Sequence, residues 1–139
     1  MGPNRRFRAA DTAQQLVGGF LLAGPFVVTE EVWVLAGSMN GLQGVVTALV
    51  VFAIGYGALY AADDRDPDCE RELAGVPLRF LSLMGVSFGS VTILALLFNA
   101  PETFLSEPSA LATALTTAKA VAVASVFSVV GAATADSVF

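Results

Sequence analysis

The sequence predicts an all-α, polytopic membrane protein with four transmembrane helices and both termini in the cytoplasm. Of the 139 residues, 55% are hydrophobic and only 14% are charged, whereas ordinary soluble domains contain about 25% charged residues. The mean hydropathy is +0.73, so too few charges remain for the polar coat of a soluble globule. The charges also cluster along the chain, which leaves long apolar windows between them.

The first two helices come from the N-terminal half. A helix that crosses the hydrocarbon core of a bilayer needs about 20 mainly apolar residues. The first helix is expected at 13–36, after a basic N-terminal segment. The next apolar window is divided at 37–41, because Gly, Ser and Asn favour turns. This division places the second helix at 41–62.

The other two helices follow the charged segment in the middle of the chain. The third is expected at 76–99, with Pro77 near its start, where proline is tolerated. The fourth is expected at 109–135, with Ser109 as the N-cap. Together the four helices form a single transmembrane domain over residues 1–139.

The basic residues determine the predicted orientation, because Lys and Arg in short loops remain on the cytoplasmic side of the membrane. The loops at 37–40 and 100–108 contain no Lys or Arg. All the arginines lie before the first helix or around the loop between the second and third, at Arg5, Arg6, Arg8, Arg65, Arg71 and Arg79. We therefore expect a multi-pass protein of the cell membrane.

Three charged residues interrupt the apolar stretches, namely Glu30, Glu31 and Lys119. An ionisable side chain at the centre of a membrane helix costs at least about 2.5–3.5 kcal/mol, so it indicates pairing or function. A rise of about 1.5 Å per residue places Glu31 and Lys119 in the same outer half of the membrane. We expect Lys119 to form a buried ion pair with Glu31 or Glu30. The alternative is a first helix that ends near Thr29, with both acids at the interface and Lys119 extended outward.

Further polar residues are expected at a similar depth, where they would line an outward-facing vestibule together with the ion pair; they are Gln43, Thr47, Thr92, Asn99 and Thr116. The alternative is close helix packing, the usual role of small and hydroxyl side chains in membrane helices. A ridge of small residues at Ala110, Ala114, Ala118 and Ala122 also favours close helix approach. Because four helices enclose little space, we expect a homo-oligomer in the lipid bilayer.

The composition excludes several classes of function. A net charge of −5 argues against nucleic-acid binding, which needs clustered Lys and Arg. The chain has no His and a single Cys, Cys69, so an intramolecular disulfide and most catalytic or metal-binding sets are excluded. The acids at 63–66 are similar to metal-binding clusters of some membrane transferases, but the second cluster such sites require is lacking. We expect no enzymatic activity, no metal and no cofactor.

Two functions remain. The first is an oligomeric channel or transporter for cations or protons, with Glu31 as the titratable group and Lys119 as its counter-charge. The alternative is a non-transporting accessory or structural subunit, in which a buried ion pair sets the helix register. In that case the acidic loop from Asp63 to Glu72 would bind a protein partner.

The first helix also contains a motif: Gly-Gly, a short apolar run, Pro, three apolar residues, Thr, any residue, Glu, any residue, Trp. It falls on Pro25, Thr29, Glu31 and Trp33, within residues 18–33. This stretch resembles the first helix of an uncharacterised family of prokaryotic integral membrane proteins, a domain of unknown function. The resemblance implies that Glu31 is the principal acid and implies no activity. Separately, the acidic balance and the single lysine resemble proteins of salt-in halophilic archaea.

Overall fold

The computed structural model describes residues 7–62, 72–73 and 75–138. Within these residues the regular secondary structure is helical apart from one short hairpin, in which β1 (Glu72–Leu73) pairs antiparallel with β2 (Val76–Pro77). The helices are α1 (Ala9–Val27), α2 (Glu30–Ser38), α3 (Gly41–Tyr56) with its π-helical continuation η1 (Gly57–Ala62), α4 (Leu78–Leu97), α5 (Ala100–Phe104) and α6 (Ala110–Val138). The predicted all-α class is therefore confirmed for the described residues.

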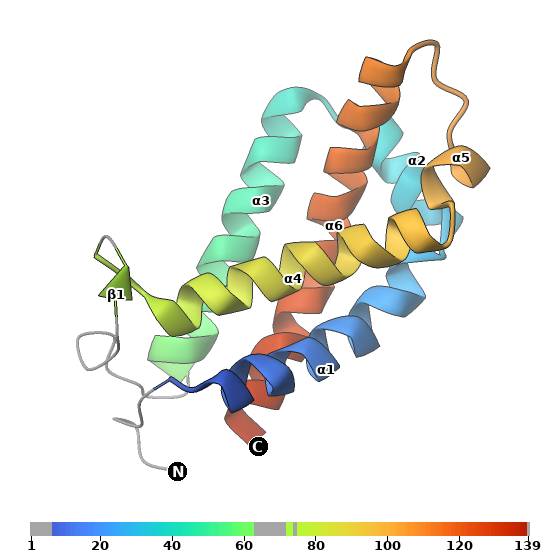
Figure 1. Cartoon of the computed structure of the whole chain (residues 1–139). Coiled ribbons are helices and arrows are strands. Elements are labelled where there is room, and N and C mark those ends of the chain that lie inside the picture. Colours follow the sequence, from blue (N-terminus) through green and yellow to red (C-terminus); the bar gives the residue numbers. More distant parts are fainter. Residues whose placement is uncertain (1–6, 63–71, 74, 139) are drawn as a thin grey trace.

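The last helix, α6, lies at the centre of the fold. It packs against α1, α2, α3 and α4, whereas α3 and α4 have few contacts with each other. In Figure 1, α1 and α4 run across α6, and the start of α1 lies near the end of α6. We refer to this region, where α1 and α4 begin and α6 ends, as the terminal end of the bundle. The turn between α2 and α3 lies at the opposite end.

Three described helical segments are long and apolar enough to cross a membrane, Gly41–Ala61, Leu78–Leu97 and Ala110–Val138. They agree with the second, third and fourth predicted helices to within a few residues. The pair α1 and α2 adds a fourth span if the two helices are counted together, although their axes are bent by 77°. The expectation of one continuous helix at 13–36 is therefore wrong, and α5 lies in a segment expected to be a loop.

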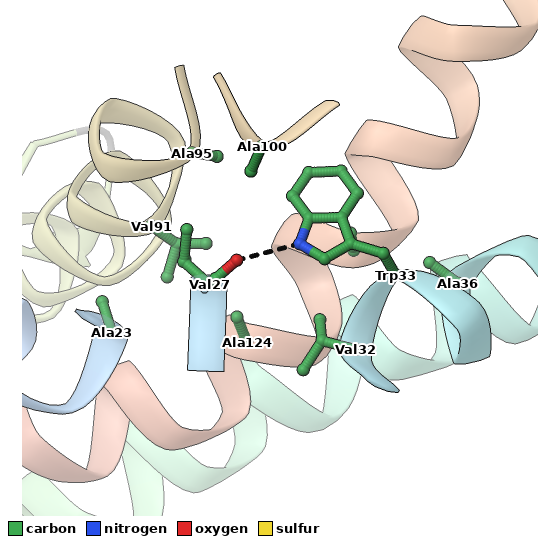
Figure 2. Close-up of a cluster of buried hydrophobic side chains, with 10 residues drawn as sticks. Ala23, Val27, Val32, Trp33, Ala36, Val91, Ala95, Ala100 and Ala124 are labelled. Carbon is green, nitrogen blue, oxygen red and sulfur yellow. Dashed lines mark hydrogen bonds between the residues drawn. The ribbon is translucent and has the colours of Figure 1, made fainter. Parts of the chain in front are cut away.

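The bend between α1 and α2 is built by the residues of the predicted motif. Pro25 has no N–H to continue the hydrogen-bond ladder of α1, and the helix ends two residues later. The Thr29 hydroxyl donates to the Pro25 carbonyl at 2.5 Å. The indole Nε1 of Trp33 donates to the Val27 carbonyl at 2.9 Å, as Figure 2 shows. Both side chains thus satisfy carbonyls at the end of α1, which would otherwise remain without a partner.

The apolar side chains are divided between the core and the outer surface. Trp33 is only 2% exposed and belongs to a core cluster with Val27, Val91 and Ala124 (Figure 2). Many other large apolar side chains lie on the outside, among them Leu42 at 72% and Leu97 at 70% exposure. Such a surface is unfavourable in water and suits contact with lipid.

Candidate functional site: a buried ion cluster

Three charged side chains meet inside the terminal end of the bundle. Arg79 lies in the first turn of α4, Asp11 in the first turn of α1, and Asp136 in the last turn of α6. The Arg79 Nη1 donates to both Asp136 carboxylate oxygens, at 2.8 and 3.0 Å, and its Nη2 donates to Asp11 Oδ2 at 3.2 Å. Arg79 is 1% exposed, and both carboxylates are fully buried. We call these three residues the ion cluster.

Neutral polar groups also contact the cluster. The Gln15 amide donates to Asp136 Oδ2 at 3.3 Å and accepts a hydrogen bond from the Ser82 hydroxyl at 2.6 Å. Ser82 and Thr12 share a further hydrogen bond of 2.8 Å. The backbone N–H of Arg8 donates to Asp11 Oδ2 at 2.9 Å. Hydrogen bonds of this kind offset the cost of removing charged groups from water.

The local sequence explains why these side chains converge. Asp11 and Gln15 are four residues apart on α1, and Arg79 and Ser82 are three apart on α4, so each pair shares one face of its helix. Asp11 also lies at a helix N-terminus, where the dipole favours an anion. Arg79 at an N-terminus and Asp136 at a C-terminus are at unfavourable helix ends. Their mutual ion pair compensates for both positions.

A seam of small and hydroxyl residues continues from the ion cluster between α1, α4 and α6. The Ser128 hydroxyl donates to the Gly19 carbonyl at 3.0 Å, and it lies 3.0 Å from the hydroxyl of Ser90. One turn away, Gly18 and Gly131 bring the backbones of α1 and α6 together. A Cβ atom added to either glycine would collide with the backbone carbonyl of the other. The backbones of α1 and α6 are therefore in direct contact where the two helices cross.

The predicted ion pair between Lys119 and Glu31 or Glu30 is not formed in the structure. The bend after Val27 places both glutamates in the first turn of α2, where they are exposed and the helix dipole favours their charge. Lys119 Nζ instead donates to the Met39 carbonyl at 2.6 Å, in the turn between α2 and α3. The estimate of matching depth assumed a straight first helix, and the bend removes that assumption. The alternative, a first helix that ends near Thr29, is closer to the structure.

Four of the five polar residues of the predicted vestibule form hydrogen bonds with residues near them in the sequence. Thr47 donates to the Gln43 carbonyl at 2.7 Å, and Thr92 to the Phe88 carbonyl at 2.8 Å, both within their own helices. The side chain of Gln43 caps the start of α3 together with Asn40. Asn99 is exposed at the N-cap of α5 with a φ of 55°. Thr116 lies 3.4 Å from a carboxylate oxygen of Glu107. These contacts give no support to a common vestibule.

The exposed part of the alanine ridge faces two open hollows on the outer surface, on either side of α6. The larger, of about 740 Å³, lies between α4 and α6 and includes Ala110, Ala114 and Thr92. The smaller, of about 500 Å³, lies between α3 and α6 and includes Lys119. Phe88 and Ala118 border both hollows.

The sequence does not reveal the ion cluster, because its members lie where charged residues normally mark the loops and helix ends of a membrane protein. Arg79 and Asp11 lie beside predicted loops, and Asp136 follows the predicted end of the last helix. The usable signal was the spacing of Asp11 to Gln15 and of Arg79 to Ser82. Among the residues that the structure describes, no group of three acids or thiols could hold a metal ion. Cys69 and the acids at 63–66 lie outside the described residues, as does most of the loop from Asp63 to Glu72.

No family model matches the chain, and comparisons with curated proteins and with solved structures find no match. The resemblance of residues 18–33 to the uncharacterised membrane protein family therefore stays a prediction. The structure adds a physical reason for three of the motif residues, because Pro25, Thr29 and Trp33 all act at the bend. It gives no comparable contact for Glu31, which is exposed.

Proposed function

We propose that the chain is a multi-pass protein of the cell membrane with both termini in the cytoplasm. The apolar outer surface and the three to four helices of sufficient length support this location. The bias of arginines toward one side supports the orientation. The single cysteine allows a direct test: a membrane-impermeant maleimide is expected to label Cys69 in inside-out vesicles and not in intact cells. Labelling in intact cells would contradict the orientation.

We further propose that the protein is a non-transporting structural or accessory subunit. The observation behind this choice is the ion cluster, which joins the starts of α1 and α4 to the end of α6 in a buried, hydrogen-bonded network. Buried ionic groups often favour one arrangement of helices over others rather than adding stability. The closed crossing at Gly18 and Gly131 agrees with a rigid packing unit. In addition, the pair of Glu31 and Lys119, which had motivated a transport role, is not formed.

Association with other chains fits the outer surface better than the interior. Ala110 and Ala114 of the ridge are exposed, and small residues of this kind permit close helix contact in membranes. We propose a homo-oligomer or a larger membrane complex, with the loop from Asp63 to Glu72 available to a protein partner. Extraction from native membranes in a mild detergent, followed by native mass measurement, is expected to give a mass above that of one chain. A single chain would contradict assembly.

Transport of cations or protons is the second candidate. It is favoured by the buried Ser125 hydroxyl, which lies about one turn of α6 from Ser128 of the seam and has no hydrogen-bond partner within the described structure. Reconstituted liposomes distinguish the two functions. A structural subunit is expected to give the same H⁺, Na⁺ and K⁺ fluxes as protein-free liposomes. A larger flux that Asp136→Asn or Glu31→Gln abolishes, in a protein that still folds, would overturn the structural proposal.

A further inference from the structure

The hollow between α3 and α6 combines an apolar lining with one cation. Gly44, Ala48, Phe88 and Ala118 provide small or apolar walls, and Lys119 lines the hollow beside them. Lys119 is the single lysine of the chain. No Asp or Glu lines this hollow, and no described carboxylate forms a salt bridge with Lys119. A cation in such surroundings favours an anionic ligand.

Lys119 is held in a defined position at the end of the bundle opposite the terminal end. Its Nζ donates one hydrogen bond to the Met39 carbonyl, in the turn that precedes α3. Its aliphatic stem lies against Gly44, where an added Cβ would come within 3.0 Å of Lys119 Cγ. An ammonium group has three N–H donors, so two remain for a ligand. The contact with the turn places this charge beside the start of α3, where an apolar segment long enough to cross a membrane begins.

We propose that this hollow binds an anionic membrane lipid, with an acyl chain against the apolar walls and the headgroup phosphate on Lys119. The inference rests on the proposed membrane location. The volume of about 500 Å³ lies within the range of about 300–1,000 Å³ that is common for small-ligand sites. Charge complementarity selects the occupant. An anionic lipid offers a phosphate to Lys119 and a flexible acyl chain to the apolar walls, whereas an apolar helix would leave Lys119 without a counter-charge.

The test uses the full-length protein in nanodiscs that contain dioleoyl phosphatidylcholine and dioleoyl phosphatidylglycerol. After extraction, native mass spectrometry measures how much phosphatidylglycerol stays bound. Lys119→Gln keeps a donor for the Met39 carbonyl and loses the charge, so its affinity is expected to fall about fivefold, the effect of one basic residue at an anionic membrane surface. Lys119→Arg should retain the lipid. Arg8→Gln, which removes an exposed charge at the terminal end, is the matched control and should also retain it.

A second pair of variants tests the apolar part of the site without changing any charge. Ala118→Phe fills the hollow, whereas Ala53→Phe places the same side chain on an exposed face of α3 outside it. Only Ala118→Phe is expected to lose the lipid. Equal retention by wild type and Lys119→Gln, or equal loss in both phenylalanine variants, would overturn the inference. If the protein does not enter nanodiscs at all, the membrane proposal itself fails. If the protein enters nanodiscs but its lipid binding does not depend on Lys119, only the proposed lipid site is refuted.

Discussion

Replacing Arg79 by methionine would leave two buried carboxylates without the guanidinium that joins them. Arg79 donates hydrogen bonds to Asp11 and Asp136, and all three side chains are at most 1% exposed. Removing one partner of a buried ion pair costs about 3–5 kcal/mol, because an uncompensated charge remains. We expect the free energy of unfolding of Arg79→Met to fall by this amount. Titration with sodium dodecyl sulfate, followed by circular dichroism in mixed micelles, measures the change.

A combined variant separates loss of the charge balance from loss of packing. Removing all three charges, with Asp11→Asn and Asp136→Asn added to Arg79→Met, is expected to recover most of the lost stability. Apolar or neutral replacements of a whole buried ion group are often nearly neutral. Arg8→Gln changes an exposed arginine near the same site and should alter stability by less than about 0.5 kcal/mol. The reasoning is refuted if Arg79→Met matches wild type, or if the triple variant is as unstable as the single one.

Three further predictions concern the helix crossing, the bend and the exposed acids. Gly131→Ala forces a Cβ into the backbone of α1 and is expected to destabilise the fold by about 1–3 kcal/mol in the same titration. At Gly85 an added Cβ would meet open space, so Gly85→Ala should be neutral or slightly stabilising. Equal effects of Gly131→Ala and Gly85→Ala would contradict a close crossing of α1 and α6. Trp33→Phe removes the hydrogen bond to the Val27 carbonyl and should lower the free energy of unfolding by about 1–3 kcal/mol. Thermal unfolding measures this change, and an unchanged stability would show that the bend does not need the indole. Glu31→Gln is expected to change stability by less than about 0.5 kcal/mol, because the side chain is exposed, and a large loss would restore the case for a buried pair.

The limits of three long helices follow from the sequence because they depend on a local property. A charge-free window of about 20 residues is sufficient to mark an apolar helix, and the segments at 41–61, 78–97 and 110–138 agree with this rule. The break at 28–29 was expected only as the alternative of a first helix that ends near Thr29, because the apolar run resumes directly after Glu31. Its cause is a set of side-chain hydrogen bonds from Thr29 and Trp33, which hydropathy does not record.

The ion cluster could not be predicted because burial at a helix end depends on which helices pack together. Asp11, Arg79 and Asp136 lie in the first or last turn of their helices, where a charge normally meets water. Their burial follows from the convergence of three helix ends. Lys119 and Glu31 match in depth only if the first helix is straight. Depth along a straight axis is a poor guide here, because α1 and α2 differ in direction by 77°.

The central position of α6 has a consequence for biosynthesis. Gln15 and Asp136, which share a hydrogen bond, are separated by 121 residues. At about 5–20 residues per second, the ribosome needs roughly 6–24 s to make the intervening chain. While α6 is being made, α1 and α4 are already present, yet the helix that packs against both of them is incomplete. The early helices must therefore wait at the insertion machinery, or pair provisionally with each other, until α6 arrives and closes the bundle.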